Sequence, residues 1–267
     1  MKQKSPSLLV GAAEADFTPA PGLTLLGQMH ERRARHTRDP LTANAIAFRQ
    51  GRQTVVLVSV DICILDNAFV KATQAAFARR TGLPGACLLL HSTHTHVAPT
   101  VFDLLTARAD PVFVRRLGAA ILTAAQRALA KLQEASVFSG LGHMEHMGWN
   151  RRAMFADGSS QMYGHAQMRG FIGMEGPRDP ALGVVYARDC QPARGSRRGA
   201  VRAVIVNFST HPNCLEAERF YSADLPGETR RVLKSALGAG VVVVYLTGAA
   251  GNTAPSLLDP YMPEQPW

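Results

Sequence analysis

The chain has 267 residues, a formal net charge of +9, 46% hydrophobic residues and 18% charged residues. This composition is that of a folded globular protein rather than a disordered chain, and the length suits one large domain or two small ones. No apolar run reaches the roughly 18 residues of a membrane-spanning helix. Residues 1–13 contain too short an apolar segment for a secretory signal, so a cytoplasmic location is expected.

The excess positive charge comes largely from arginine, which is compatible with contact to an anionic membrane surface or an anionic substrate. Nucleic acid is not an expected partner, because the sequence has no helix-turn-helix, zinc-finger spacing or interleaved aromatic pattern. The four cysteines form no CxxC pair, and a disulfide framework is not expected. The arginines are clustered at Arg32, Arg33, Arg35 and Arg38, at Arg151 and Arg152, at Arg194, Arg197 and Arg198, and at Arg230 and Arg231.

The first half of the chain predicts two strands and two helices. The apolar, β-branched run at 55–60 predicts a strand that ends at Asp61, and 67–81 predicts a helix that stops at Gly82. A second strand at 86–90 completes a strand–helix–strand unit with a parallel crossover. A helix is expected at 110–133 and a strand at 135–142. Residues 148–178 are rich in Gly, Met and polar residues, which indicates an irregular loop region.

The second half predicts a strand at 201–208, a helix at 224–237 and a strand at 241–246. Together these elements predict an α/β fold with a central, mainly parallel mixed sheet flanked by helices. Four strands end in polar or glycine-rich segments: Asp61, the segment 91–96, His211, and the segment 248–252. Ligands bind at the carboxyl edge of such sheets, so a shared metal site is expected at that edge.

Histidines dominate these strand ends. His94 and His96 are two residues apart, so an extended backbone would direct both imidazoles to the same side. With His211 they would supply nitrogen ligands for a hydrolytic zinc ion, which needs one position open for water. His143 and His146 are interpreted as loop or strand-edge residues, and His30, His36 and His165 have no supporting pattern.

Two carboxylates and one arginine complete this set. Asp61 and Asp224 are each interpreted as a metal ligand or as a group that orients an imidazole. A strand-end cap for Asp61 and a helix N-cap for Asp224 remain open alternatives. Arg151 is either a group that holds an oxyanion or a solvated loop arginine.

In combination, motifs along nearly the whole chain resemble the N-terminal catalytic domain of the neutral/alkaline, non-lysosomal ceramidase family. The THTH tetrad at 93–96 with Pro99 is the most specific of them. The others, in family order, are DFTP at 16–19, DPL at 39–41, VSVD at 58–61, NRR at 150–152, NF at 207–208 with HP at 211–212, SAD-x-PG at 222–227, and GAAGNTAP at 248–255.

This resemblance implies a zinc-dependent amidohydrolase that cleaves the N-acyl amide bond of ceramide or a related N-acyl substrate, with a place in sphingolipid metabolism. It implies that His94 and His211 are Zn²⁺ ligands, and that His96 and Arg151 are catalytic. Asp61, Asp224 and Asn252 are then partners around the metal ligands. The implied partner is a small-molecule or lipid amide, and members of the family are often secreted.

Three departures accompany the resemblance. The remaining zinc ligands of the family, a Glu and a Tyr, lie beyond the Gly-Asp-x-x-Pro loop, and Tyr261 and Glu264 sit in no recognisable motif. Asn252 stands where the family has Asp, and Ala254 where it has Ser. The immunoglobulin-like C-terminal domain of the family is not expected within these 267 residues. Residues 1–267 are therefore expected to form a single hydrolase domain that is incomplete at its C-terminus. A truncated or degenerate member without turnover, and a basic non-enzymatic binding module, remain alternatives.

Overall fold

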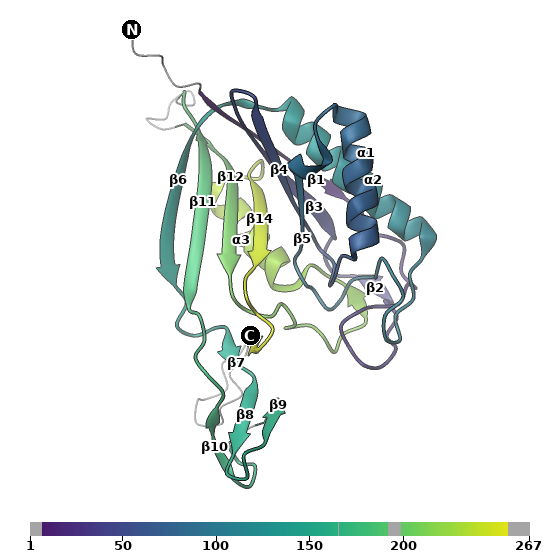
Figure 1. Ribbon diagram of the computed structural model, residues 1–267, viewed down its shortest axis with the longest axis vertical. Coiled ribbons are helices and arrows are strands. Elements are labelled where there is room, and N and C mark those ends of the chain that lie inside the picture. The colour runs from purple at the N-terminus through teal and green to yellow at the C-terminus, as the bar shows by residue number, and fades with distance from the viewer. Residues whose placement is uncertain (1–6, 165, 192–198, 256–267) are drawn as a thin grey trace.

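The computed structural model describes residues 7–164, 166–191 and 199–255. Its centre is an eight-stranded sheet, and three helices pack on it (Figure 1). The strands of this sheet are β1 (Leu8–Asp16), β3 (Thr42–Gln50), β4 (Gln53–Val60), β5 (Leu88–Ser92), β6 (Gln133–His143), β11 (Ala181–Asp189), β12 (Val201–Phe208) and β14 (Val242–Thr247). Their order across the sheet is β14-β12-β11-β6-β1-β3-β4-β5.

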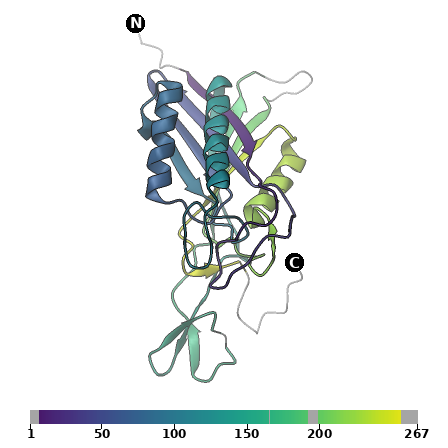
Figure 2. The same cartoon turned by 90° about the vertical axis from the view of Figure 1, so that its right-hand side faces the viewer.

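The helices lie on the outer faces of the sheet. α1 (Asn67–Thr81) and α2 (Pro111–Ala130) run side by side over the half that contains β1, β3 and β4, whereas α3 (Asp224–Leu237) packs on β14 (Figure 2). Capping residues define the first two helices: Asp66 accepts a hydrogen bond from the Phe69 backbone, and Asp110 accepts one from the Phe113 backbone. The predicted α/β fold with a mixed sheet flanked by helices is confirmed.

The expectation of a mainly parallel sheet is wrong for the middle of the sheet. Only β4–β5 and β12–β14 are parallel pairs, and the other five neighbouring pairs are antiparallel. Buried strands of either direction show the same apolar runs, so sequence pattern alone does not reveal their direction. The two parallel pairs occupy the two edges of the sheet.

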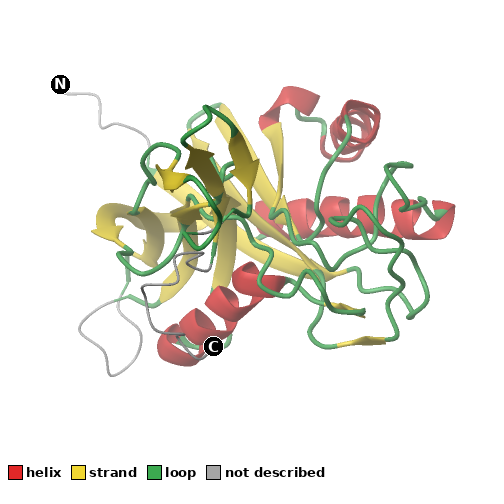
Figure 3. Cartoon of the chain, turned by 90° about the horizontal axis from the view of Figure 1, so that it is seen from below, coloured by secondary structure: helices red, strands yellow, loops and turns green. Residues whose placement is uncertain are grey.

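The sheet folds over so that its two halves face each other, as the view from below shows (Figure 3). Val10, Ile46 and Val244 meet in the layer between the halves, together with small residues such as Ala203. At one end the two edges touch, because the Ser59 hydroxyl donates a hydrogen bond of 2.6 Å to the Tyr245 carbonyl. The carboxyl ends of both parallel pairs therefore come together.

Short strands complete the described structure. Residues expected to form an irregular loop instead include a three-stranded sheet of β8 (Arg152–Phe155), β9 (Ser160–Met162) and β10 (Phe171–Met174), which extends below the main sheet in Figure 1. β2 (His36–Thr37) pairs with β13 (Phe220–Tyr221), β7 (Trp149–Asn150) pairs with β15 (Thr253–Ala254), and the 3-10 turn η1 (Gly85–Cys87) precedes β5. Among the described residues, no helix has the length and apolar character needed to cross a membrane.

Candidate metal centre

Two of the candidate histidines follow directly after β5. The backbone at His94 is left-handed, with φ of 68°, and its N–H donates a hydrogen bond of 3.0 Å to the Ile62 carbonyl. The chain is therefore turned at this point rather than extended, in contrast to the expectation from the alternation of side chains. The turn still brings His94 and His96 to one place, with ring centroids 5.1 Å apart.

His211, which follows β12, completes a cluster of three imidazoles. Its Nε2 lies 3.1 Å from Nε2 of His94 and 3.0 Å from Nε2 of His96. Each Nδ1 faces an oxygen acceptor instead. His94 Nδ1 lies 2.8 Å from the Cys63 carbonyl, His211 Nδ1 lies 3.0 Å from the Ala250 carbonyl, and His96 Nδ1 lies 2.9 Å from Glu216 Oε2.

These contacts assign the tautomers. A neutral imidazole carries one N–H, and an oxygen at Nδ1 holds that proton there. The three Nε2 lone pairs then point at one another with no proton between them. A metal ion bound by these nitrogens would remove the repulsion, and an oxygen partner on the remote nitrogen is the usual support for a metal-bound histidine.

Burial keeps two of these rings neutral. It lowers the pKa of His211 to about 3, and the positive charge of Arg151 adds to this effect. Burial likewise lowers the pKa of His94, with a further contribution from His96. Protons therefore do not compete with a metal ion for these two nitrogens near neutral pH.

A thiol lies beside the same cluster. The ligand atoms of Cys63, His94 and His96 all lie within 4.8 Å of one another, and Cys63 Sγ is 3.7 Å from His94 Nδ1. One cysteine and two histidines thus form a group that could hold a metal ion, in addition to the three-imidazole arrangement. Burial raises the pKa of Cys63 to about 12, so the free thiol is protonated. Cys63 was not among the metal ligands expected from the sequence.

Arg151 lies beside the imidazoles in a buried position. Its Nη1 donates a hydrogen bond of 2.7 Å to the Tyr163 hydroxyl, and its Nη2 donates one of 2.7 Å to the Gly251 carbonyl. Its backbone N–H binds the carbonyl of Asn252 at 2.8 Å, whereas the Asn252 residue itself is exposed. Asn252 therefore contributes to the site through its backbone.

Asp61 lies deeper in the fold than the histidines. Arg230 binds it in a bidentate pair, with distances of 3.0 Å to Oδ1 and 2.6 Å to Oδ2. Thr42 donates to it from both backbone and side chain, and the Thr93 hydroxyl donates over 3.4 Å. Among the described residues Asp61 has no hydrogen bond to an imidazole, so it anchors the strand end next to His94 rather than a histidine ring.

Asp224 holds a loop in place. It is the first residue of α3, with φ of 54°, and the N-cap position belongs to Ala223. Its Oδ2 accepts a hydrogen bond of 3.0 Å from the Leu215 backbone, and its Oδ1 accepts one of 2.7 Å from the Leu225 backbone. The loop it holds carries Glu216, the carboxylate partner of His96.

Sequence analysis missed three residues around His96. Glu216 binds its Nδ1, and the fully buried Arg32 donates a hydrogen bond of 2.6 Å to its carbonyl. Gly27 has φ of +128°, and a Cβ there would stand 2.4 Å from His96 Cγ. None of the three carries a motif, and in the sequence Arg32 was noted only as part of a cluster of arginines. His143 and His146 are exposed, as interpreted, and His165, Arg194, Arg197, Arg198, Tyr261 and Glu264 lie outside the described residues.

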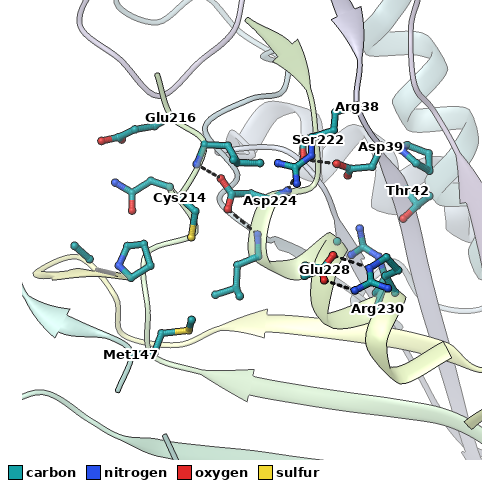
Figure 4. Close-up of a pocket in the computed structure, with 18 of the residues that line it drawn as sticks. Arg38, Asp39, Thr42, Met147, Cys214, Glu216, Ser222, Asp224, Glu228 and Arg230 are labelled. Carbon is teal, nitrogen blue, oxygen red and sulfur yellow. Dashed lines mark hydrogen bonds and ion pairs between the residues drawn. The ribbon is translucent and has the colours of Figure 1, made fainter. Parts of the chain in front are cut away.

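A cavity of about 1230 Å³ adjoins the cluster. Tyr163, Asn213 and Glu216 line it, and it extends past Asp224 to the charged side chains on the first turns of α3 (Figure 4). The imidazoles themselves are not part of its wall. The cavity therefore lies beside the cluster, and Glu216 links the two because it lines the cavity and binds His96.

The fold is that of known ceramidase structures. The crystal structure of neutral ceramidase from Pseudomonas aeruginosa matches with a TM-score of 0.76 and 20% identity, covering 96% of this chain and 40% of that chain. A structure described as ceramidase complexed with C2 matches with a TM-score of 0.73 and 20% identity, covering 94% of this chain and 39% of that one. The chain thus spans about 40% of the length of the first. No protein-family model and no curated protein matches the sequence.

Proposed function

We propose that this chain is a zinc-dependent amidohydrolase of the neutral ceramidase type that hydrolyses the N-acyl amide bond of ceramide or a related lipid amide. The convergence of three Nε2 atoms, each with its Nδ1 on an oxygen, carries the proposal. The ceramidase fold supports the reaction class. We further propose that residues 1–267 belong to a single hydrolase domain.

In this proposal His94 and His211 hold the metal through Nε2. Imidazole donors suit zinc, and a hydrolytic zinc ion keeps one position open. Bound zinc would lower the pKa of a water molecule toward neutrality and so provide a nucleophile for the amide carbonyl.

The other side chains bind and orient the substrate. Arg151 places positive charge where the carbonyl oxygen becomes negative, and its bonds to Tyr163 and Gly251 fix its direction. His96 keeps its proton on Nδ1 because Glu216 accepts it there, which leaves Nε2 to accept a proton or to bind the metal.

Metal content of the purified chain tests the proposal. We expect about one zinc per chain by elemental analysis, lost in His94→Ala/His211→Ala because both Nε2 donors are removed. The matched control is His143→Ala/His146→Ala, since both residues are exposed and the pair removes the same number of imidazoles. Unchanged zinc in the first variant, or equal loss in the control, would refute the ligand assignment.

Hydrolysis of an N-acylsphingosine by the zinc-loaded chain tests the activity. Turnover that a chelator abolishes and zinc restores is the expected result. Zinc binding without turnover would instead favour a metal-binding domain that lacks activity on its own, a reading supported by its span of 40% of a ceramidase chain.

We also propose peripheral contact with an anionic membrane surface, supported by the net charge of +9. Cosedimentation with phosphatidylserine vesicles should be salt-sensitive, whereas neutral phosphatidylcholine vesicles should bind little. Equal binding to both would contradict it. Anionic binding unaffected by a chelator, in a chain that holds no zinc, would favour a basic binding module instead.

A further inference from the structure

Tyr163 occupies a strained position next to the imidazole cluster. It follows β9 with φ of 59°, and its backbone N–H donates a hydrogen bond of 2.6 Å to the Arg151 carbonyl. Non-glycine residues adopt this backbone conformation rarely, and those that do gather at functional sites. His94 and Asp224 share the conformation and belong to the same site.

The Tyr163 hydroxyl oxygen receives two hydrogen bonds. Arg151 Nη1 donates over 2.7 Å and Asn213 Nδ2 donates over 3.3 Å. The Asn213 side chain also hydrogen-bonds to the carboxylate of Glu216, which requires its N–H₂ on that side and so fixes the amide orientation. The Arg151 guanidinium lies over the Tyr163 ring, 5.3 Å from its centroid.

These contacts determine what the hydroxyl can still do. A phenolic oxygen has two lone pairs and one hydrogen, and here both lone pairs are used. In the described part of the chain, the hydroxyl hydrogen of Tyr163 is donated to no acceptor. The positive guanidinium that donates to the oxygen makes the O–H a stronger donor, because it draws electron density away from the hydrogen.

Tyr163 lines the cavity, and its hydroxyl contacts Arg151, which lies beside the imidazoles. Tyr163, Asn213 and Glu216 line the cavity, and Glu216 binds His96 directly. The charge of Arg151 contributes to the lowered pKa of His94 and of His211, so the Arg151–Tyr163 pair lies beside the proposed metal ligands. An amide that reaches the cluster from the cavity therefore passes this donor.

We propose that Tyr163 is a further catalytic residue, and that its hydroxyl donates a hydrogen bond to the carbonyl oxygen of the bound N-acyl amide. The bond strengthens as that oxygen becomes negative in the tetrahedral state, and the hydrogen remains on the phenolic oxygen throughout. This inference rests on the proposed amide hydrolysis.

Tyr163→Phe removes only the hydroxyl. In the zinc-loaded full chain we expect kcat for an N-octanoyl amide to fall about 100-fold, with KM changed by less than about threefold. Zinc content should stay the same. The matched control is Tyr186→Phe, since Tyr186 stacks on Phe138 on the sheet and lies outside the site. Unchanged kcat would overturn the proposal, and lost zinc would show that Tyr163 acts as a ligand instead.

Binding of octylphosphonate, a tetrahedral anion with an alkyl tail, separates this inference from the proposed function. Calorimetric titration should show about tenfold weaker binding to zinc-loaded Tyr163→Phe than to the wild type or Tyr186→Phe. If the wild type binds the probe through Tyr163 but hydrolyses no amide, the oxyanion contact stands and the proposed hydrolysis fails. Equal binding by the wild type and Tyr163→Phe overturns the contact even if hydrolysis occurs. No binding by the wild type overturns it as well.

Discussion

The three imidazoles are held by different partners. Backbone carbonyls hold Nδ1 of His94 and His211, whereas a carboxylate holds Nδ1 of His96. A charged carboxylate therefore orients the His96 ring, whereas neutral backbone carbonyls orient the other two.

Gly27 is the residue that leaves room for His96. A Cβ at Gly27 would stand 2.4 Å from His96 Cγ, at φ of +128°. We expect Gly27→Ala to weaken zinc binding about tenfold or more, because the added methyl group displaces the His96 ring and so disturbs the cluster. Competition with a fluorescent zinc chelator measures the affinity.

Gly22 provides the matched control for that substitution. Its φ is +117°, and nothing lies within 4 Å of a Cβ placed there. Gly22→Ala therefore carries the same backbone strain, of about 1 kcal/mol, without a clash. Similar zinc affinity in the two variants would show that strain alone, and not displacement of His96, explains the effect.

At the scale of elements, a buried ion pair ties α3 to the end of β4. Arg230 on α3 binds Asp61, and both side chains are shielded from water, with exposed fractions of 8% and 0%. Asp61 also accepts from Thr93, the neighbour of His94. The docking of α3 and the position of the turn that carries His94 are thus coupled through one carboxylate.

Asp61→Asn should lower the free energy of unfolding by about 3–5 kcal/mol, because it leaves the Arg230 charge buried without its partner. Glu228→Gln is the control on the same helix. It breaks the exposed pair with Arg231 and should cost less than about 1 kcal/mol. Urea denaturation measures both. Equal losses would contradict a special role for the buried pair.

Some elements were predictable from local signals. The strand 201–208 and the helices 67–81 and 224–237 have the predicted bounds, since apolar periodicity and terminal residues such as Gly82 act locally. β1 and β3 had no such signal. Gly11 and Ala13 have low strand propensity, and they are small because α2 packs on their face of the strand: a Cβ at Gly11 would lie 2.1 Å from the Ala128 carbonyl.

At the scale of the whole molecule, the folded sheet builds the site. β5 and β14 are the two edge strands, yet the Thr247 hydroxyl at the end of β14 donates a hydrogen bond of 2.7 Å to the Thr93 carbonyl after β5. His94 follows the edge strand β5, and His211 follows β12, the neighbour of the other edge strand. A ligand that joins them would also hold the two halves of the sheet together.

Zinc should consequently stabilise the whole fold. A ligand present at 100 times its Kd contributes about 2.7 kcal/mol, which corresponds to a rise in Tm of roughly 5–10 °C for a chain of this size. Calorimetry of chelator-treated and zinc-loaded protein measures the shift. Mg²⁺ should give no rise, since it prefers oxygen ligands. An equal rise with zinc in His94→Ala/His211→Ala would place the stabilising ion elsewhere.

The sequence by itself determined the chemistry available: an α/β chain whose strands end in His94, His96 and His211, with Arg151 as a further polar group. These features are local, because strand endings follow from the change between apolar and polar residues. Only the tertiary structure decided that the sheet is mostly antiparallel and folded on itself. It also decided that Glu216, Arg32 and Gly27 support His96. Asp61 and Asp224 hydrogen-bond to backbone N–H groups and hold those segments in place. Contacts between residues more than sixty positions apart depend on sheet order and packing, which local patterns do not encode.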